Sequence, residues 1–158
     1  MPIKLNTILL EAGLPLKDVR LVRHADTKAK PGRKPYDLWR CDRPMFELYQ
    51  SIQSKSSRTR HILNASYWVD FVVNPNKETM FAGLYSAKYR GLLKEDTPAP
   101  HMDFVWKAGD WDVYDLTLQD VLADLIGKLF IDWGLGFRAW VQYPDRQNKS
   151  VIELPRPF

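Results

Sequence analysis

Two apolar runs joined by a short turn constrain the fold of this chain more than any other feature. SYWVDFVV (66–73) and TMFAGLYSAKYRG (79–91) flank the turn NPNKE (74–78). Runs of β-branched and aromatic residues on either side of an Asn-Pro turn predict an antiparallel hairpin. Successive side chains of a strand point to opposite faces of the sheet, so the first strand should present two distinct sides. One side holds Tyr67, Val69 and Phe71, and the other holds Trp68, Asp70 and Val72.

Three helices are predicted from apolar residues that recur three and four positions apart. The first covers residues 4–15, and the second begins near Asp42 as its N-cap and runs through residue 53. The third, TLQDVLADLIGKL (117–129), has the clearest pattern, because Thr117 can cap its first turn. Its apolar stripe would consist of Leu118, Val121, Leu122 and Leu125.

The remaining apolar segments are short and alternate in the manner of strands. They are VRLVRH (19–24), KLFIDW (128–133), FRAWVQY (137–143) and KSVIEL (149–154), and short turns separate the last three. The segments 25–35 and 94–112 are predicted loops because Pro and Gly interrupt them. The sequence therefore predicts an α+β fold with a curved, mostly antiparallel sheet or small β-barrel and about three helices.

Length and composition point to one soluble domain. The chain has 158 residues, which fits the roughly 100–200 residues of a single domain, so residues 1–158 are expected to form one unit. No apolar run approaches the roughly 20 residues that span a bilayer, and the N-terminus lacks a signal-peptide pattern. The single cysteine, Cys41, cannot form an internal disulfide, so a reducing, cytoplasmic location is expected and a membrane partner is not.

Catalytic and cofactor patterns are missing from the sequence. The three histidines are far apart in sequence, no HExxH pair occurs, and no glycine-rich phosphate loop follows a predicted strand. Asp70 is the one strand carboxylate that stands out, and a structural role is the better interpretation of it. We therefore expect that this chain is not an enzyme and that it holds neither a metal nor another cofactor.

Charge is distributed unevenly along the chain. Residues 17–60 carry twelve Lys or Arg against five Asp or Glu, whereas residues 92–132 carry three Lys against nine Asp or Glu. A cationic surface of this kind would attract a polyanion such as nucleic acid. The alternative is an ordinary solvated surface on which the two signs pair across the fold. The side chains predicted to contact a nucleic-acid backbone are Lys30, Arg33, Lys34, Arg40, Arg58, Arg60, Lys88 and Arg90.

The stretch FAGLYSAKYRG (81–91) superficially resembles the two tripeptides of GIY-YIG nucleases. Those tripeptides are separated by about ten residues in that family, whereas here only three residues lie between Tyr85 and Tyr89, and Arg90 replaces an apolar residue. The match is therefore accidental. A β-bulge or a site of close packing accounts for Gly83 more simply.

Longer segments resemble the N-terminal domain of bacterial GIY-YIG nuclease family proteins. They include LNTILLEAGLPLKDVRLVRH (5–24), GRKPYDLWR (32–40), VYDLTLQDVLADLIGKLFIDWG (113–134) and RAWVQYPDRQNKSVIEL (138–154), so the resemblance extends over nearly the whole chain. It implies that a nuclease module follows, with residues 155–158 as the start of a linker to it. The full-length protein would then be an endonuclease through that missing module.

By weaker analogy, several restriction-type nucleases carry a PUA-like reader, such as an EVE or SRA domain, that flips a modified base into an aromatic cage. This analogy implies a double-stranded DNA partner and a target-recognition role, with methylated cytosine as a candidate base. An RNA reader of PUA-like architecture and a protein-interaction or homodimerisation module remain alternatives. Most of the aromatic side chains are nonetheless expected in the core. The candidate base-pocket residues are Tyr36, Trp39, Tyr49, Gln50, Gln53, Trp68, Asp70 and Tyr85.

Overall fold

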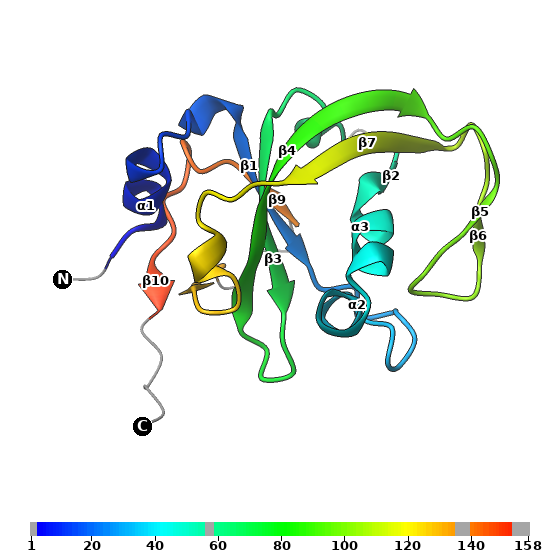
Figure 1. Ribbon diagram of the computed structural model, residues 1–158, viewed down its shortest axis with the longest axis horizontal. Helices are drawn as coiled ribbons and strands as arrows, with labels where there is room; N and C mark the ends of the chain where they lie inside the picture. The colour runs from blue at the N-terminus through cyan, green and yellow to red at the C-terminus, as the bar shows by residue number, and fades with distance from the viewer. Residues whose placement is uncertain (1–2, 56–58, 135–139, 153–158) are drawn as a thin grey trace.

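The computed structural model describes residues 3–55, 59–134 and 140–152, and within them the fold is α+β (Figure 1). Three α-helices accompany a strongly curled, mostly antiparallel sheet that forms a half-barrel, which confirms the predicted fold class. The helices are α1 (Leu5–Glu11), α2 (Pro35–Cys41) and α3 (Arg43–Ser51). The strands are β1 (Val19–His24), β2 (Ile52–Ser54), β3 (Tyr67–Val73), β4 (Thr79–Leu92), β5 (Thr97–Pro98), β6 (Val105–Trp106), β7 (Trp111–Leu118), β8 (Phe130–Ile131), β9 (Val141–Gln142) and β10 (Val151–Ile152).

Strand β4 organises the sheet. The order of the main path is β10-β8-β4-β3-β1-β9, and β7 pairs with both β4 and β2. Strands β1 and β3 are parallel, whereas the other pairs are antiparallel. The first half of β4 pairs with β3 and the second half pairs with β7, so this long strand carries the curl of the sheet (Figure 1).

Strands β3 and β4 form the predicted hairpin, and residues 74–78 make the turn between them. Its register shifts between Asp70 and Phe71, where Gly83 lies opposite Asp70 with a φ of +148°. Glycine adopts this backbone conformation readily, whereas residues with a Cβ rarely do. The expected bulge at Gly83 is therefore confirmed, and it explains why a glycine interrupts an otherwise bulky strand.

Alternation along β3 divides the core into layers. Val69 and Phe71 pack with Leu5 and Leu9 of α1 on one side of the sheet. On the other side, Val72 packs with Phe46 of α3 and with further residues of α2 and β4. Helices α2 and α3 therefore occupy the concave side beneath the arch of β4 and β7, away from α1 (Figure 1).

The helix predicted for residues 117–129 is wrong. Strand β7 extends to Leu118, because Thr117 and Leu118 pair with Ser86 and Tyr85 of β4. Only a short 3₁₀ turn at Ala123–Leu125 follows. Helix α2, which was not predicted, is the third helix instead. The predicted number of helices therefore agrees with the structure, but the position of one of them does not.

The other local predictions agree with the structure only in part. Asp42 accepts a hydrogen bond from the Met45 backbone N–H at 3.4 Å and caps α3, as expected. Strand β1 forms as predicted, and Arg20 within it is buried. The segment 94–112 was predicted to be a loop, but it carries β5, β6 and the start of β7. The expected linker at residues 155–158 lies outside the described part of the chain. Among the described helices, none is long and apolar enough to span a bilayer.

Candidate functional site

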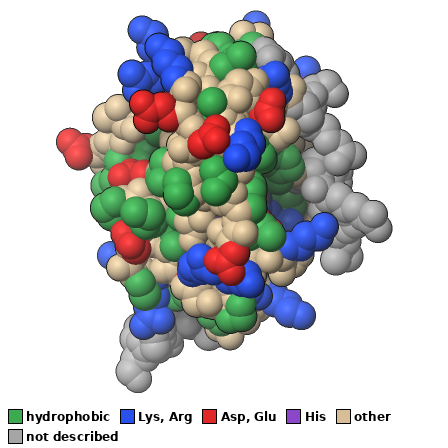
Figure 2. Space-filling view, turned by 90° about the vertical axis from the view of Figure 1, so that its right-hand side faces the viewer, with side chains coloured by type: hydrophobic (Ala, Val, Ile, Leu, Met, Phe, Trp, Pro, Cys, Tyr) green, Lys and Arg blue, Asp and Glu red, His purple; other side chains and the backbone are tan. Residues whose placement is uncertain are grey.

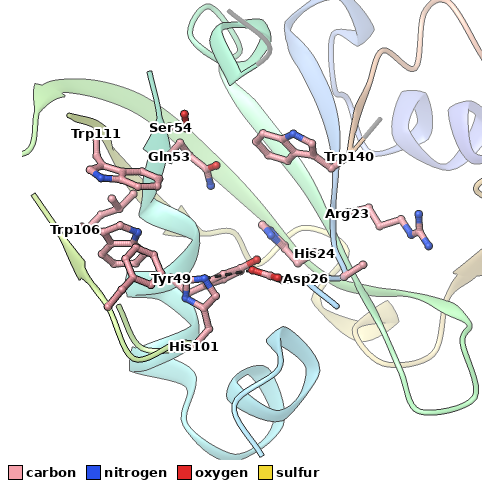
Figure 3. Close-up of a pocket in the computed structure, with 13 residues that line it drawn as sticks. Arg23, His24, Asp26, Tyr49, Gln53, Ser54, His101, Trp106, Trp111 and Trp140 are labelled. Atoms are coloured by element: carbon pink, nitrogen blue, oxygen red, sulfur yellow. Dashed lines mark ion pairs between the residues drawn. The ribbon is translucent and has the colours of Figure 1, made fainter. Parts of the chain in front are cut away.

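An aromatic pocket opens between the end of β1, strand β2 and the segment that carries β5 and β6. Its volume is about 430 Å³. Figure 3 shows Trp106, Trp111 and His101 along one wall and Trp140 across the opening. The lining residues, here called the aromatic pocket, are Arg23, His24, Ala25, Asp26, Tyr49, Ile52, Gln53, Ser54, His101, Phe104, Trp106, Trp111 and Trp140.

The rings of one wall form a continuous series of contacts. The Tyr49 ring meets His101 edge-on with centroids 4.7 Å apart, and His101 lies 5.9 Å from Trp106. Trp106 in turn lies 5.9 Å from Trp111, and the half-exposed Phe104 ring contacts both indoles. Trp106 and His101 are buried, and Trp106 belongs to a core cluster with Ile52 and Ala99, so they support the wall from behind. Phe104 and Trp111 are the rings of this wall that present accessible surface.

A carboxylate and an imidazole meet at the edge of the aromatic pocket. His101 Nε2 lies 3.2 Å from Asp26 Oδ2, although His101 is nearly buried. Burial lowers the pKa of His101, an effect that Asp26 opposes and Arg33 reinforces. Burial also raises the pKa of Tyr49, and the nearby Asp26 and Asp70 carboxylates add to that rise, so its phenol stays protonated and can donate a hydrogen bond.

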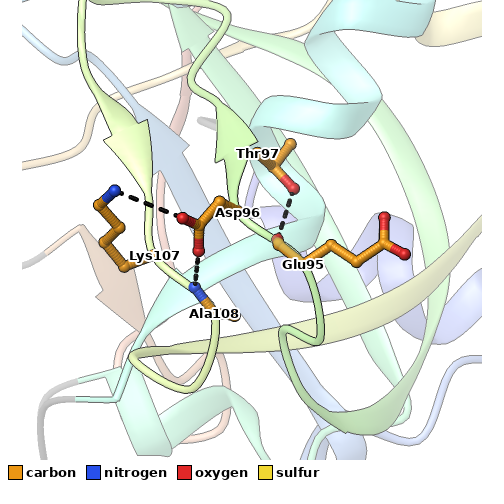
Figure 4. A network of polar contacts seen from close by, with 5 residues as sticks. All are labelled: Glu95, Asp96, Thr97, Lys107 and Ala108. Carbon is orange, nitrogen blue, oxygen red and sulfur yellow. Dashed lines mark hydrogen bonds and ion pairs between the residues drawn. The ribbon is translucent and has the colours of Figure 1, made fainter.

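The β5–β6 hairpin that carries this wall is fixed at both ends. At its base, Asp96 accepts hydrogen bonds from the Ala108 backbone N–H at 2.9 Å and from Lys107 Nζ at 3.3 Å (Figure 4). At its tip, Asp103 pairs with Lys30 at 3.0 Å and with Arg33 at 2.8 Å. The Asp96 contacts close the base of the hairpin, and the Asp103 pairs connect its tip to the loop after β1.

A buried polar pair lies beneath the pocket. His24 Nε2 is 3.7 Å from Asp70 Oδ1, and both side chains are almost inaccessible to solvent. Burial raises the pKa of Asp70, whereas His24 and Gln50 favour its charged form. Because its carboxylate is fully buried, Asp70 can act on a ligand only through His24, which lines the pocket.

The structure brings only some of the predicted base-pocket residues together. Tyr49 and Gln53 line the aromatic pocket, and Tyr36 lines a different cavity. Trp39, on α2, donates its indole N–H to the Ala82 carbonyl at 3.1 Å and packs against the cluster that contains Phe46 of α3 and Val72 of β3. The remaining four, Gln50, Trp68, Asp70 and Tyr85, are fully buried and do not line the aromatic pocket.

The predicted phosphate-contacting cations do not form one surface. Lys30 and Arg33 pair with Asp103, and Arg90 pairs with Asp115 at 3.1 Å. The face that carries β5, β6, α2 and α3 shows both signs of charge interspersed with apolar side chains (Figure 2). Lys34, Arg40 and Lys88 are exposed, whereas Arg58 and the Arg60 side chain lie outside what the structure describes. Pairing of the two signs, the alternative interpretation of the charge pattern, therefore applies to three of the six predicted cations whose side chains the structure describes.

Several pocket residues were not predicted because they lie in segments read as loops. Residues 101–111 read HMDFVWKAGDW and were expected to form an acidic loop. The segment contains a histidine and three large rings within eleven residues, and this density could have indicated that it packs on the fold rather than forming a solvated loop. His24, Asp26 and Trp140 join the pocket only through the tertiary fold, and no local pattern indicates them.

The described residues contain no group of three or more His, Cys, Asp or Glu side chains arranged to hold a metal ion. The polar groups that line the aromatic pocket beside its rings include the Gln53 amide and the Asp26 carboxylate. Comparison with protein-family models, with curated proteins and with solved structures finds no match for this chain.

Proposed function

We propose that this domain is a nucleic-acid reader that holds one unstacked nucleobase in the aromatic pocket. The observation that carries the proposal is the pair of accessible rings, Phe104 and Trp111, which Trp106 and His101 support from behind and which face Trp140 across a cavity of about 430 Å³. That volume lies within the range of about 300–1,000 Å³ typical of small-ligand sites. Planar bases bind between such rings, and each stacking contact is worth about 1–3 kcal/mol.

Polar groups at the pocket edge supply the means of reading a base. Asp26 accepts hydrogen bonds, Tyr49 can donate one, and the Gln53 amide offers both functions. The Gln53 side-chain N–H already donates to the Gln50 carbonyl at 2.7 Å, which fixes the amide in place. Fixed donors and acceptors at the edge of an aromatic slot are what discrimination between bases requires.

Double-stranded DNA is the proposed partner, because the resemblance to nuclease-associated domains implies a target-recognition role for this module. A methylated cytosine remains the proposed candidate base within that role. Flipping a base from a duplex costs a few kcal/mol, which two or three stacking contacts can offset.

A quaternary ammonium group, such as a methylated lysine, also binds aromatic cages, but this pocket suits it less well. The carboxylate in the pocket lining, Asp26, is already engaged by His101. An ammonium ligand would have to compete with His101 for this counter-charge. A planar base can stack on Phe104 and Trp111 without displacing His101.

The test measures binding of the chain to fluorescent oligonucleotides by anisotropy at low salt. The panel consists of duplexes with unmodified, methylated or hydroxymethylated cytosine, the matching single strand, the RNA of equal sequence and a trimethyl-lysine peptide. Trp111→Ala should weaken nucleic-acid binding by about 5- to 150-fold, the loss of one stacking contact. Phe104→Ala should act in the same direction at little cost to folding, since its ring is 38% exposed.

Trp39→Ala is the matched control, because Trp39 is a half-buried indole that lies outside the aromatic pocket. Wild-type affinity in Trp111→Ala would refute the proposal, as would an effect confined to Trp39→Ala. Stronger binding to the trimethyl-lysine peptide than to any nucleic acid would replace the nucleobase with an ammonium ligand. Preference for the RNA strand would keep the pocket and change the partner.

A further inference from the structure

A second cavity, of about 440 Å³, lies beside the aromatic pocket. The two cavities share Arg23 and Ala25, so they adjoin at the end of β1. Figure 3 shows the Arg23 side chain pointing away from the rings of the aromatic pocket. The second cavity, here called the cationic cavity, is lined by Arg23, Ala25, Thr27, Lys34, Pro35, Tyr36, Asp37, Val73, Asn74, Pro75 and Lys77.

Three cations and one carboxylate line the cationic cavity. Arg23, Lys34 and Lys77 come from β1, the start of α2 and the β3–β4 turn, respectively. The carboxylate, Asp37, accepts a hydrogen bond from the Lys34 backbone N–H at 3.1 Å and so caps the first turn of α2. Within the described residues none of the three cations forms an ion pair, unlike Lys30 and Arg33.

Arg23 is the most constrained of these cations. Its backbone N–H donates to the Trp140 carbonyl at 2.8 Å, and its guanidinium lies 5.7 Å from the Trp133 ring centroid. Its Nε is buried and has no hydrogen-bond partner among the described residues. A guanidinium held in this way has donors available for an anion.

Lys77 is held in a backbone conformation that lysine rarely adopts. Its φ is +63°, in the left-handed region that favours glycine or asparagine. The Lys77 backbone N–H donates to the Asn74 carbonyl at 2.9 Å, and Asn74 also bonds Glu78 through its side chain, so the turn is closely defined. Hairpin loops commonly close with a residue in this conformation, so the turn geometry fixes where Lys77 lies at the cavity wall.

We infer that the cationic cavity binds a backbone phosphate of the strand whose base enters the aromatic pocket. This inference rests on the proposed function and names a subsite of it. Unpaired cations from three separate elements meet in one concave surface, and phosphate is the anionic group that lies next to every base. Arg23 borders both cavities, so it lies between the base and the phosphate.

The test compares Lys34→Ala/Lys77→Gly with the control pair Lys94→Ala/Lys128→Ala in the binding assay above. Both pairs remove two charges, and Lys94 and Lys128 are exposed outside both cavities. The cavity variant should weaken binding at least tenfold more than the control and lower the slope of log affinity against log salt by about 0.7–0.9 per lost phosphate contact. Lys77→Gly alone should weaken binding while raising the melting temperature, because glycine relieves the left-handed strain.

Different failures separate the two proposals. Equal affinities for the cavity variant and its control, with a clear loss in Trp111→Ala, would overturn the phosphate subsite and leave the nucleobase proposal intact. No nucleic-acid binding by the wild type would overturn both. Inorganic phosphate binding that depends on Lys77, without any effect of Lys77→Gly on oligonucleotide affinity, would also overturn the subsite, because the cavity would then hold free phosphate instead.

Discussion

Replacement of Gly83 by alanine tests whether the bulge in β4 is required for the fold. Gly83 has a φ of +148°, and an added Cβ would lie 2.9 Å from Leu118 Cδ1 and 3.1 Å from Tyr85 Cε1. The backbone strain for an L-residue in such a region costs about 1–3 kcal/mol. Leu118 is 40% exposed and can move aside, whereas Tyr85 is fully buried and cannot, so overpacking adds about 1–3 kcal/mol.

Gly83→Ala should therefore lower the free energy of unfolding by roughly 2–6 kcal/mol, against a total of about 5–15 kcal/mol for a domain of ordinary stability. Urea unfolding followed by tryptophan fluorescence measures the change. Gly109→Ala is the matched control, because Gly109 also has a positive φ, of +85°, but no atom lies within 4 Å of an added Cβ. It should lose only the backbone part, about 1–2 kcal/mol.

An equal loss of stability in the two variants would refute the reasoning, because steric contact at Gly83 would then contribute nothing. The double variant Gly83→Ala/Leu118→Ala separates the remaining terms. If Tyr85 supplies the steric cost, removal of the Leu118 side chain should leave most of it in place. Recovery to the level of Gly109→Ala would assign that cost to Leu118 instead.

Three further predictions concern buried charged groups. Burial raises the pKa of Asp70 above 3.8, so the protonated carboxyl stabilises the fold most below that pH, and this stabilisation is lost as pH rises through the raised pKa. The melting temperature of Asp70→Asn minus that of wild type should therefore increase between about pH 4 and pH 8. Burial lowers the pKa of His101 below 6.5, so the neutral imidazole stabilises the fold fully above that pH, and this stabilisation falls as pH drops through the lowered pKa. From about pH 7 to pH 5, the melting temperature of wild type should therefore fall more than that of His101→Gln. Arg20 donates to three backbone carbonyls at 2.9–3.0 Å, so Arg20→Lys should cost roughly 1–3 kcal/mol in urea unfolding, whereas Arg146→Lys, on the same Tyr143 ring, should cost less.

Local pattern was sufficient for the β3–β4 hairpin and for α3. In both, the signal lies within about a dozen neighbouring residues: alternation around a turn in the first, and a capping Asp42 with helical spacing in the second. The bulge at Gly83 was predicted for the same reason, since a glycine among bulky strand residues usually marks a bulge or a close backbone approach.

The segment 117–129 shows how tertiary pairing overrides a helical pattern. Thr117 and Leu118 satisfy their backbone groups on β4, which removes the start that the helix needed. Leu122 then adopts a left-handed φ of +65°, which ends any continuous helix. The apolar spacing is nonetheless used, because Leu122, Leu125 and Ile126 pack on the core that includes α1. Of the predicted apolar stripe, however, only Leu122 and Leu125 pack there, because Leu118 and Val121 are exposed; the helical pattern was therefore wrong for the backbone and for half of the stripe.

The aromatic pocket could be predicted only in part, because its walls are far apart in the sequence. Tyr49 and Gln53 belong to a segment whose helical spacing was recognised, so they could be proposed. Trp106 and Trp140 meet them across the fold only after β1, β7 and β9 have paired. Trp68 was proposed from the same hairpin logic that succeeded for the fold, but its face of β3 packs on Tyr114 with ring centroids 5.1 Å apart.

Pairing between the basic and acidic segments changes how the charge asymmetry of the sequence should be understood. Lys30 and Arg33 meet Asp103 at the tip of the β5–β6 hairpin, and these groups are substantially exposed. Exposed ion pairs contribute only about 0–1 kcal/mol each, so they add little to overall stability. Their position is more informative, because they hold the wall of the aromatic pocket against the loop after β1. Such cations would have to leave Asp103 to bind phosphate, whereas Arg23, Lys34 and Lys77 would not. The cationic cavity is therefore better placed to bind a polyanion than Lys30 and Arg33 are.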